Sequence, residues 1–172
     1  FVTFAKKQVF GKCGIDFLAG PSEVMIVADE SCNVDFVAAD MLAQCEHDKD
    51  ARAYLIAFSD EFINKVKACA NKFLCNLQTA EIAKEAFENS IAIKVNTLEE
   101  AFALSEKRAP EHLELCFVNA EKYIDKLSNY GSLFIGNYSA EVFGDYASGT
   151  NHTLPTNQVP KYSGGLSVFD FI

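Results

Sequence analysis

Short apolar runs alternate with longer amphipathic stretches along most of this chain, and this alternation restricts its fold more than any other feature. The run Glu23–Ala28 is β-branched and almost continuously apolar, which is typical of a strand buried on both faces of a parallel sheet. Amphipathic stretches of about ten residues or more separate such runs, and parallel strands need crossovers of that length. The sequence therefore predicts an α/β fold: an incomplete, Rossmann-like, mainly parallel sheet flanked by helices.

Polar residues that can cap helices precede several of the amphipathic stretches. Asn33, Asp60 and Thr79 are candidate N-caps, and Thr97 opens a Thr-x-x-Glu capping box. Gly131 is expected to end the last helix. Beyond the first strand, the pattern predicts strands at 53–58, 91–95, 113–118 and 133–136, and helices at 1–12, 33–47, 60–73, 79–88, 97–107 and 120–127.

The length of 172 residues indicates one α/β domain, 1–172, with enough chain to bury a core. Regular patterning thins out from about residue 137, so 137–172 is expected to be mostly an irregular active-site loop and tail. The sequence begins with Phe1 inside a helical pattern, and we expect it to be part of a longer protein.

Composition excludes several classes of function. A formal net charge of −9 without a basic stripe argues against binding nucleic acid. No apolar run approaches the roughly 18 residues that span a bilayer, and no signal peptide is recognisable, so a membrane role is not expected. The six cysteines form no Cys-x-x-Cys pair, which indicates a reducing compartment: the cytoplasm, or the plastid in a plant.

The polar stretch from Gly144 to Pro155 has the composition of a loop, with an acid, a histidine, hydroxyls and an amide between two glycines and a proline. All three histidines of the chain have acidic or amide residues close to them in the sequence, which favours a functional site over a merely solvated surface. Open α/β sheets bind ligands outside the carboxyl ends of their strands, and we expect the candidate groups to lie there. These groups are Ser22, Gln44 with His47, Glu111 with His112, and Asp145 with His152.

Gln44 and His47 are three residues apart, which places them on one face at the end of the predicted helix. A histidine and an oxygen donor in this arrangement can bind a divalent cation, with Asp145 as a third ligand. The alternative is that a charged His47 only complements the helix C-terminus.

Glu111 and His112 form a natural acid/base pair if both line a pocket, because histidine titrates near neutrality and a glutamate can activate water. The alternative is that adjacent residues of an extended segment point to opposite sides, leaving one buried and one solvated. The chain has no Gly-x-Gly-x-x-Gly, P-loop or Gly-x-Ser-x-Gly motif. The residues alone thus reach a metal and acid/base site, but no substrate.

Four segments together resemble the histidinol dehydrogenase family, in their order and separation as well as their residues, and the resemblance extends over nearly the whole chain. They are Ala-Gly-Pro-Ser-Glu-Val at 19–24, Asp40 through Gln-Cys-Glu-His at 44–47, Ala-Pro-Glu-His-Leu at 109–113 and Gly-Asp-Tyr-Ala-Ser-Gly-Thr-Asn-His-Thr-Leu-Pro at 144–155. The resemblance implies a zinc-dependent enzyme that oxidises L-histidinol to L-histidine in two NAD-linked steps through an aldehyde, in histidine biosynthesis.

The resemblance also implies a role for individual residues. Gln44, His47 and Asp145 match zinc ligands, and the zinc holds the imidazole and amino nitrogens of the substrate. Ser22 matches a substrate-binding serine, and His112 also contacts the substrate. Glu111 and His112 match the catalytic acid/base pair, with His112 taking protons from the alcohol and Glu111 activating water. His152 has no assigned role, and we expect it to pack against or orient Asp145.

The chain departs from the family pattern in places. Ala109 stands where the family usually has glycine. In the family, the partner subunit of a homodimer supplies a fourth zinc ligand, a histidine, together with a substrate-binding glutamate, from a C-terminal segment. The NAD contacts lie upstream of Phe1. We therefore expect that these 172 residues alone do not turn over histidinol. Two alternatives stay open: a family member that oxidises another small alcohol, and a truncated, non-catalytic assembly module.

Overall fold

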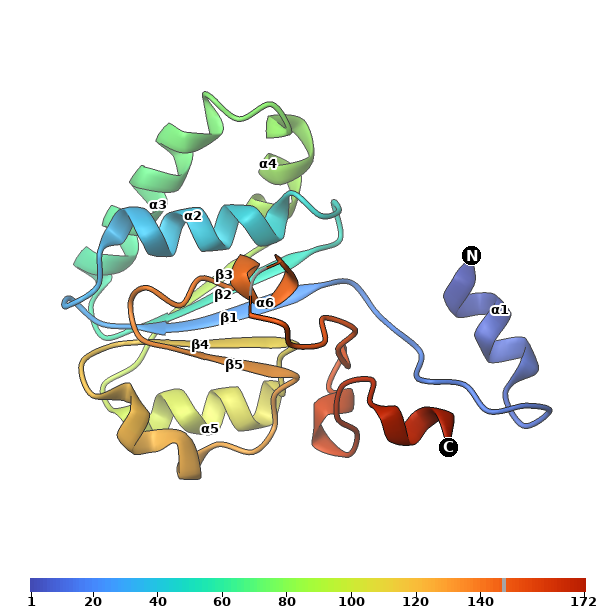
Figure 1. Ribbon diagram of the computed structural model, residues 1–172. Helices are drawn as coiled ribbons and strands as arrows, with labels where there is room; N and C mark the ends of the chain where they lie inside the picture. The colour runs from blue at the N-terminus through green and yellow to red at the C-terminus, as the bar shows by residue number, and fades with distance from the viewer. Residues whose placement is uncertain (147) are drawn as a thin grey trace.

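A parallel five-stranded sheet with helices on both faces forms the centre of the computed structural model (Figure 1), which describes residues 1–146 and 148–172. The strand order is β3-β2-β1-β4-β5. This is the order of a doubly wound nucleotide-binding sheet without its sixth strand, so the α/β fold predicted from the sequence is confirmed. The strands are β1 (Glu23–Ala28), β2 (Arg52–Ala57), β3 (Ile91–Lys94), β4 (His112–Cys116) and β5 (Ser132–Ile135).

The helices divide between the two faces of the sheet (Figure 1). Three helices, α2 (Val34–Cys45), α3 (Asp60–Leu74) and α4 (Ala80–Glu88), cover one face, and α5 (Leu98–Arg108) covers the other with the 3₁₀-helix η1 (Ala120–Lys126). The remaining elements are α1 (Val2–Val9), α6 (Val142–Tyr146), η2 (Val159–Lys161) and η3 (Val168–Phe171). Ala147 belongs to the polar stretch singled out in the sequence and lies outside the described residues.

Alternate residues of β1 supply two separate hydrophobic cores. Val24 and Ile26 pack with α2, α3 and α4, whereas Met25 and Val27 pack with residues of α5, β4 and η1. All six residues of β1 are buried. A strand with helices on both sides has no solvated face, which is why its sequence shows no polar alternation.

The caps follow the predictions in part. Asn33 accepts a hydrogen bond from the Asp35 backbone N–H, and Thr97 caps α5 as expected. The N-cap of α3 lies one residue earlier than predicted, because the hydroxyl of Ser59 accepts the Phe62 N–H. Asp60 instead lies in the first turn, where its charge complements the helix dipole. The predicted helix 120–127 is a 3₁₀-helix ending at Lys126.

Gly131 does not cap that helix; it allows two backbone segments to approach. A Cβ at this position would lie 2.5 Å from the backbone oxygen of Glu111, while one at Gly164 would meet nothing within 4 Å. We expect Gly131→Ala to destabilise the chain by about 1–3 kcal/mol, since backbone cannot yield as a flexible side chain does. Urea unfolding against Gly164→Ala checks this, and equal midpoints would contradict it.

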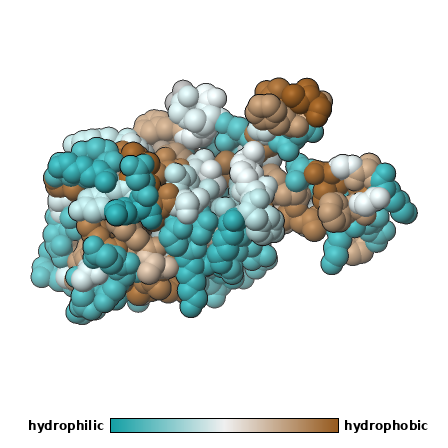
Figure 2. Space-filling view, turned by 90° about the horizontal axis from the view of Figure 1, so that it is seen from below, coloured by the Kyte–Doolittle hydropathy of each residue, from teal (hydrophilic) through white to brown (hydrophobic). Residues whose placement is uncertain are grey.

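Exposed apolar side chains gather on two projections, on the side where Figure 1 places both termini (Figure 2). They belong to α1 and its neighbours (Phe1, Val2, Phe4 and Phe10) and to η3 and its neighbour (Val168, Phe169, Phe171 and Ile172). Among the described residues, no helix combines the length and the apolar character that crossing a bilayer requires.

Candidate active site

The candidate residues gather at the amino ends of the strands, not at the carboxyl ends as we expected from other open α/β sheets. His112 is the first residue of β4 and pairs with Val24, the second residue of β1. Helix α2 runs back from the end of β1, so Gln44 comes to the same edge (Figure 1). At the switch point between the carboxyl ends of β1 and β4, Cys32 and Cys116 contact each other and leave little open space.

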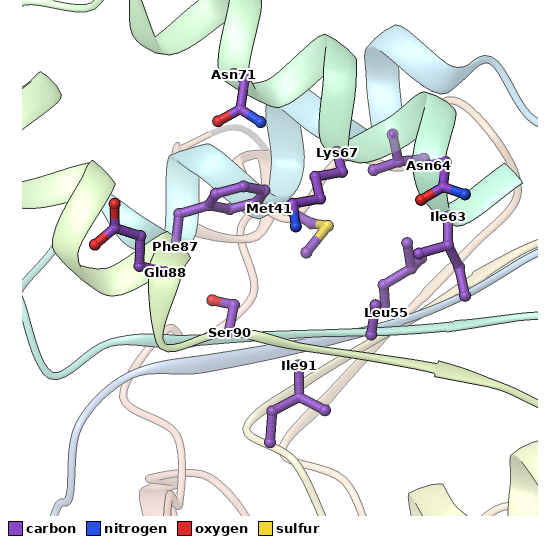
Figure 3. A pocket seen from close by; sticks show the side chains of 12 residues that line it. Met41, Leu55, Ile63, Asn64, Lys67, Asn71, Phe87, Glu88, Ser90 and Ile91 are labelled. Atoms are coloured by element: carbon purple, nitrogen blue, oxygen red, sulfur yellow. The ribbon is translucent and has the colours of Figure 1, made fainter. Parts of the chain in front are cut away.

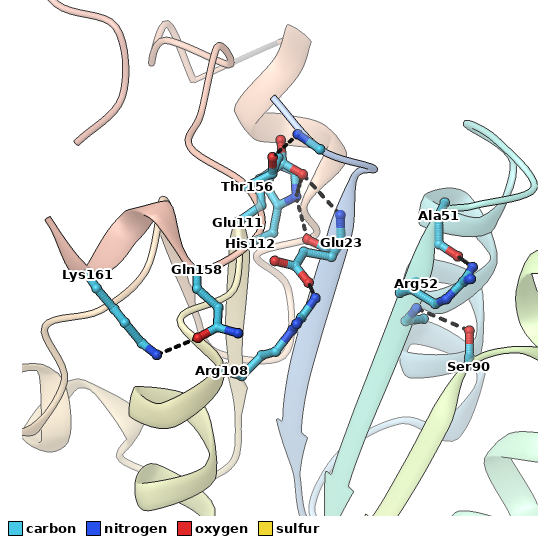
Figure 4. Close-up of polar contacts among 12 residues, drawn as sticks. Glu23, Ala51, Arg52, Ser90, Arg108, Glu111, His112, Thr156, Gln158 and Lys161 are labelled. Atoms are coloured by element: carbon cyan, nitrogen blue, oxygen red, sulfur yellow. Dashed lines mark hydrogen bonds and ion pairs between the residues drawn. The ribbon is translucent and has the colours of Figure 1, made fainter. Parts of the chain in front are cut away.

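Glu23, the first residue of β1, holds both members of the acid/base pair through its backbone. Its N–H donates to Glu111 Oε2 at 3.0 Å, and its carbonyl oxygen lies 3.1 Å from His112 Nδ1 (Figure 4). A carbonyl only accepts hydrogen bonds, so Nδ1 carries the imidazole proton and Nε2 keeps its lone pair. Glu111 and His112 are both buried, which removes the alternative that one of them is solvated.

Burial moves the pKa values of the pair in opposite directions. It raises the pKa of Glu111 to about 8, with the nearby carboxylates adding to the effect. It lowers the pKa of His112 to about 4, because an imidazolium loses its hydration there. Near neutral pH the metal-free pair is therefore mainly a neutral carboxylic acid beside a neutral imidazole. A carboxyl group with this pKa is suited to proton transfer at physiological pH.

The raised pKa of Glu111 predicts a pH-dependent stability. Between pH 4.5 and about 8 the folded chain keeps a proton that the unfolded chain releases, so the stability that Glu111 contributes falls as pH rises. We expect the free energy of unfolding of Glu111→Gln to rise relative to that of the wild type by a few kcal/mol between pH 5 and 8.5, because a difference of one pKa unit corresponds to about 1.4 kcal/mol. Urea unfolding of the metal-free chain, with the exposed Glu99→Gln as control, measures it; parallel pH profiles would contradict it.

Three side chains near the pair could hold a metal ion. One ligand atom each from His47, Glu141 and Asp145 lies within 4.8 Å of the other two. They line an open cavity of 280 Å³. His47 lies just beyond the end of α2, so the helix is shorter than predicted, although the backbone N–H of His47 still donates to the carbonyl of Gln44. Asp145 belongs to α6, so the polar stretch begins as a short helix and not as a loop.

Glu141 connects this metal group to the acid/base pair. Its Oε1 lies 3.4 Å from His112 Nε2, and the side chain is only 3% exposed. This oxygen has no hydrogen-bond partner among the described residues. A buried carboxylate oxygen without a partner is costly unless a cation or a donor completes its surroundings. The residues present therefore fit a divalent cation.

Gln44 is fully buried and contacts His112 in this structure. Its amide oxygen lies 3.2 Å from His112 Nδ1, and its amide nitrogen is buried without a hydrogen-bond partner among the described residues. Ser22 lies in the turn that leads into β1, and its carbonyl accepts the backbone N–H of Arg52. Gln44 thus contacts the acid/base pair directly, whereas Ser22 comes next to it only as the neighbour of Glu23 in the chain.

His152 is exposed to solvent, so it is not part of the buried interior, and its expected role of packing against or orienting Asp145 stays a prediction. Beyond α6, Gly149 adopts a positive φ of 76°. The residue before His152, Asn151, contacts the C-terminal part of the chain, where its side-chain amide donates to the backbone oxygen of Leu166. Of the three histidines, two therefore reach the site.

Comparison with known proteins shows the family of the chain. A family model described as histidinol dehydrogenase matches residues 1–172, the whole chain. The chain belongs to the histidinol dehydrogenase family.

Two curated members of the histidinol dehydrogenase family show how the chain relates to it. The histidinol dehydrogenases of Methanocaldococcus jannaschii and Chlorobium chlorochromatii are each 47% identical to it over its full length, which is 40% of theirs. A crystal structure of histidinol dehydrogenase from Elizabethkingia anophelis superposes with a TM-score of 0.95 at 42% identity, covering 99% of this chain and 40% of that one. The chain thus spans about two fifths of the length of these relatives.

Sequence reasoning missed Glu23 and Glu141. Glu141 lies four residues before Asp145, one helical turn along the chain, and that spacing was the available signal. The contribution of Glu23 comes from its backbone, for which a sequence carries no signal. A cavity of 500 Å³ between α3, α4 and β2 is lined by Met41, Leu55, Phe87 and other residues remote from the candidate site (Figure 3).

Proposed function

We propose that the full-length protein is an NAD-dependent, zinc-dependent histidinol dehydrogenase that oxidises L-histidinol to L-histidine by way of the aldehyde. The observation that carries this proposal is the contact between Glu141 and His112 Nε2. It brings a proton-accepting nitrogen directly beside a group of potential metal ligands. Oxidation of an alcohol needs a base close to the point where the substrate hydroxyl is held.

The residues of this chain divide the work as follows. His112 accepts the hydroxyl proton at Nε2, while the carbonyl of Glu23 keeps the proton on Nδ1 and fixes the ring. Glu111 transfers a proton to or from the water that adds to the aldehyde. Ser22, in the turn before β1, binds substrate. Bound NAD would supply the hydride acceptor for each of the two oxidations.

A zinc ion would be held by His47 and Asp145, together with Gln44 after its amide turns away from His112. Bound zinc would supply a positive charge that fixes the imidazole and amino nitrogens of histidinol and polarises its hydroxyl. Glu141 lies beside both groups and contributes a negative charge to the same cavity. The further zinc ligand and the NAD contacts are proposed to come from a homodimer partner and from the remaining parts of the full-length chain.

The test is an assay of the purified full-length protein with L-histidinol and NAD. We expect two NADH for each histidine formed, loss of activity after zinc is chelated, and recovery when zinc is restored. A zinc-loaded, folded protein that forms no NADH from histidinol would contradict the proposal. Faster oxidation of other small alcohols than of histidinol would favour the alternative substrate within the same family.

A further inference from the structure

We propose that Arg108 is a positioning residue for the acid/base pair and acts through Glu23. This inference rests on the proposed function, because it concerns the residues that carry proton transfer. Arg108 ends α5, next to the connection that leads to Glu111, and its guanidinium forms an ion pair with the Glu23 carboxylate (Figure 4).

Glu23 is the residue on which both members of the pair depend. Its backbone N–H and carbonyl contact Glu111 and His112 at 3.0 and 3.1 Å, so any movement of this residue moves both contacts together. Its side chain is only 2% exposed and has Arg108 as its cationic partner. The ion pair therefore fixes the side chain of the residue whose backbone fixes the catalytic groups.

The same contacts tie down both ends of one short connection. Arg108 and Glu111 flank Ala109 and Pro110, and each of them contacts Glu23. Ala109 has a φ of 52°, in the left-handed region that a residue with a Cβ rarely adopts, and it is completely buried. A connection in this conformation needs restraint from its surroundings to stay there.

Arg108 is itself held in place on its other side. Its guanidinium lies 4.9 Å from the centre of the Tyr54 ring, an arrangement in which a cation and an aromatic face attract. These side chains line a cavity of 240 Å³ together with Pro21, Glu23, Asp50, Arg52 and Asn157. Arg52 offers a matched control, because its side chain donates to the backbone oxygens of Lys49 and Ala51 and not to Glu23.

Loss of Arg108 would leave a buried carboxylate without its cationic partner. Such a group has to move or to admit water, since a buried charge is tolerated only when it is paired. Movement of Glu23 would disturb the alignment of Glu111 and His112 without touching His47, Glu141 or Asp145. Proton transfer should therefore suffer, while binding of the metal and the substrate should not.

The experiment compares Arg108→Met, Arg108→Lys and Arg52→Met in the zinc-loaded full-length protein. We expect Arg108→Met to lower kcat by about 10- to 100-fold, the effect of a small misplacement of catalytic groups, with KM for histidinol and zinc affinity within about 2-fold. Arg108→Lys should recover part of the loss, and Arg52→Met should behave as wild type. Amide hydrogen exchange at Glu23 should accelerate in Arg108→Met.

Wild-type kcat and wild-type exchange at Glu23 in Arg108→Met would overturn the inference, as would an equal loss of kcat in Arg52→Met. If Arg108→Met does not fold, Arg108→Gln, which also removes the charge, gives the same two readings, and wild-type values in both would count against the inference. A wild-type protein inactive on histidinol would contradict the proposed function instead. In that case, amide hydrogen exchange at Glu23 would by itself test whether Arg108 holds Glu23 in place.

Discussion

Replacement of His112 by alanine in the full-length protein is expected to lower kcat for histidinol oxidation by about 10²- to 10⁴-fold, the usual contribution of a general base. The reason is the geometry of its two nitrogens. Nδ1 faces the Glu23 carbonyl and the Gln44 amide oxygen, so only Nε2 is free to take the substrate proton. Steady-state kinetics with histidinol and NAD measures the effect.

The exposed His152 provides the control for this experiment. His152→Ala also removes a histidine ring, but from an exposed position in the polar stretch, and its kcat should stay within about 2-fold of wild type, as expected of most surface substitutions. Zinc affinity of His112→Ala should change much less than kcat, because His112 is not among the three grouped metal-binding side chains. A loss below about 10-fold in His112→Ala would remove it from the role of base.

The strands and most helices could be predicted because burial leaves a periodic trace in the sequence. β1 was predicted at its observed bounds, since a strand covered on both faces must be apolar throughout. Details that depend on one hydrogen bond were predicted less well. Ser59 and Asp60 are both good N-caps, and the choice between them rests on which backbone is extended.

The position of the site could not be predicted from the sequence, because it depends on the direction in which chain segments return. The expectation of the carboxyl edge came from other α/β sheets. Here α2 ends at the amino edge, and α6 lies against that end after the chain has left β5. Residues such as His47 and Glu141 are far apart in the sequence, and only the fold brings them together.

The burial of individual site residues could not be predicted from the sequence either. Glu111 and His112 are adjacent on an extended segment, where alternation favours one inward and one outward side chain. Both are buried because Glu111 precedes β4 and its carboxylate reaches the Glu23 N–H, whereas His112 already belongs to the strand. Pattern reasoning placed both residues on one extended segment before the strand, whereas β4 begins at His112.

Removal of His47 or Asp145 is expected to have the largest effect on zinc binding. We expect His47→Ala and Asp145→Asn each to weaken zinc binding to the full-length protein by more than about 100-fold, above the 10- to 100-fold typical of residues that only support a ligand. Both side chains are at least partly exposed in the open cavity, so their replacement should leave the core intact. Competition with a chromogenic chelator at fixed pH measures the affinity.

Two controls match these substitutions in chemistry and exposure. His152→Ala removes an exposed histidine, and Asp125→Asn neutralises an exposed carboxylate on η1; both should bind zinc as the wild type does. Wild-type zinc affinity in His47→Ala or Asp145→Asn would show that the group does not bind the metal, however close its atoms lie.

Glu141→Gln separates the two sides of the site. Its carboxylate lies near both the candidate metal ligands His47 and Asp145 and the ring of His112. The amide of the glutamine variant keeps the shape of the side chain but removes its charge. We expect zinc binding to weaken by about 10- to 100-fold, as for a supporting residue, and kcat to fall even at saturating zinc. If zinc restored kcat in full, Glu141 would act on the metal alone, and the 3.4 Å contact with His112 would have no part in proton transfer.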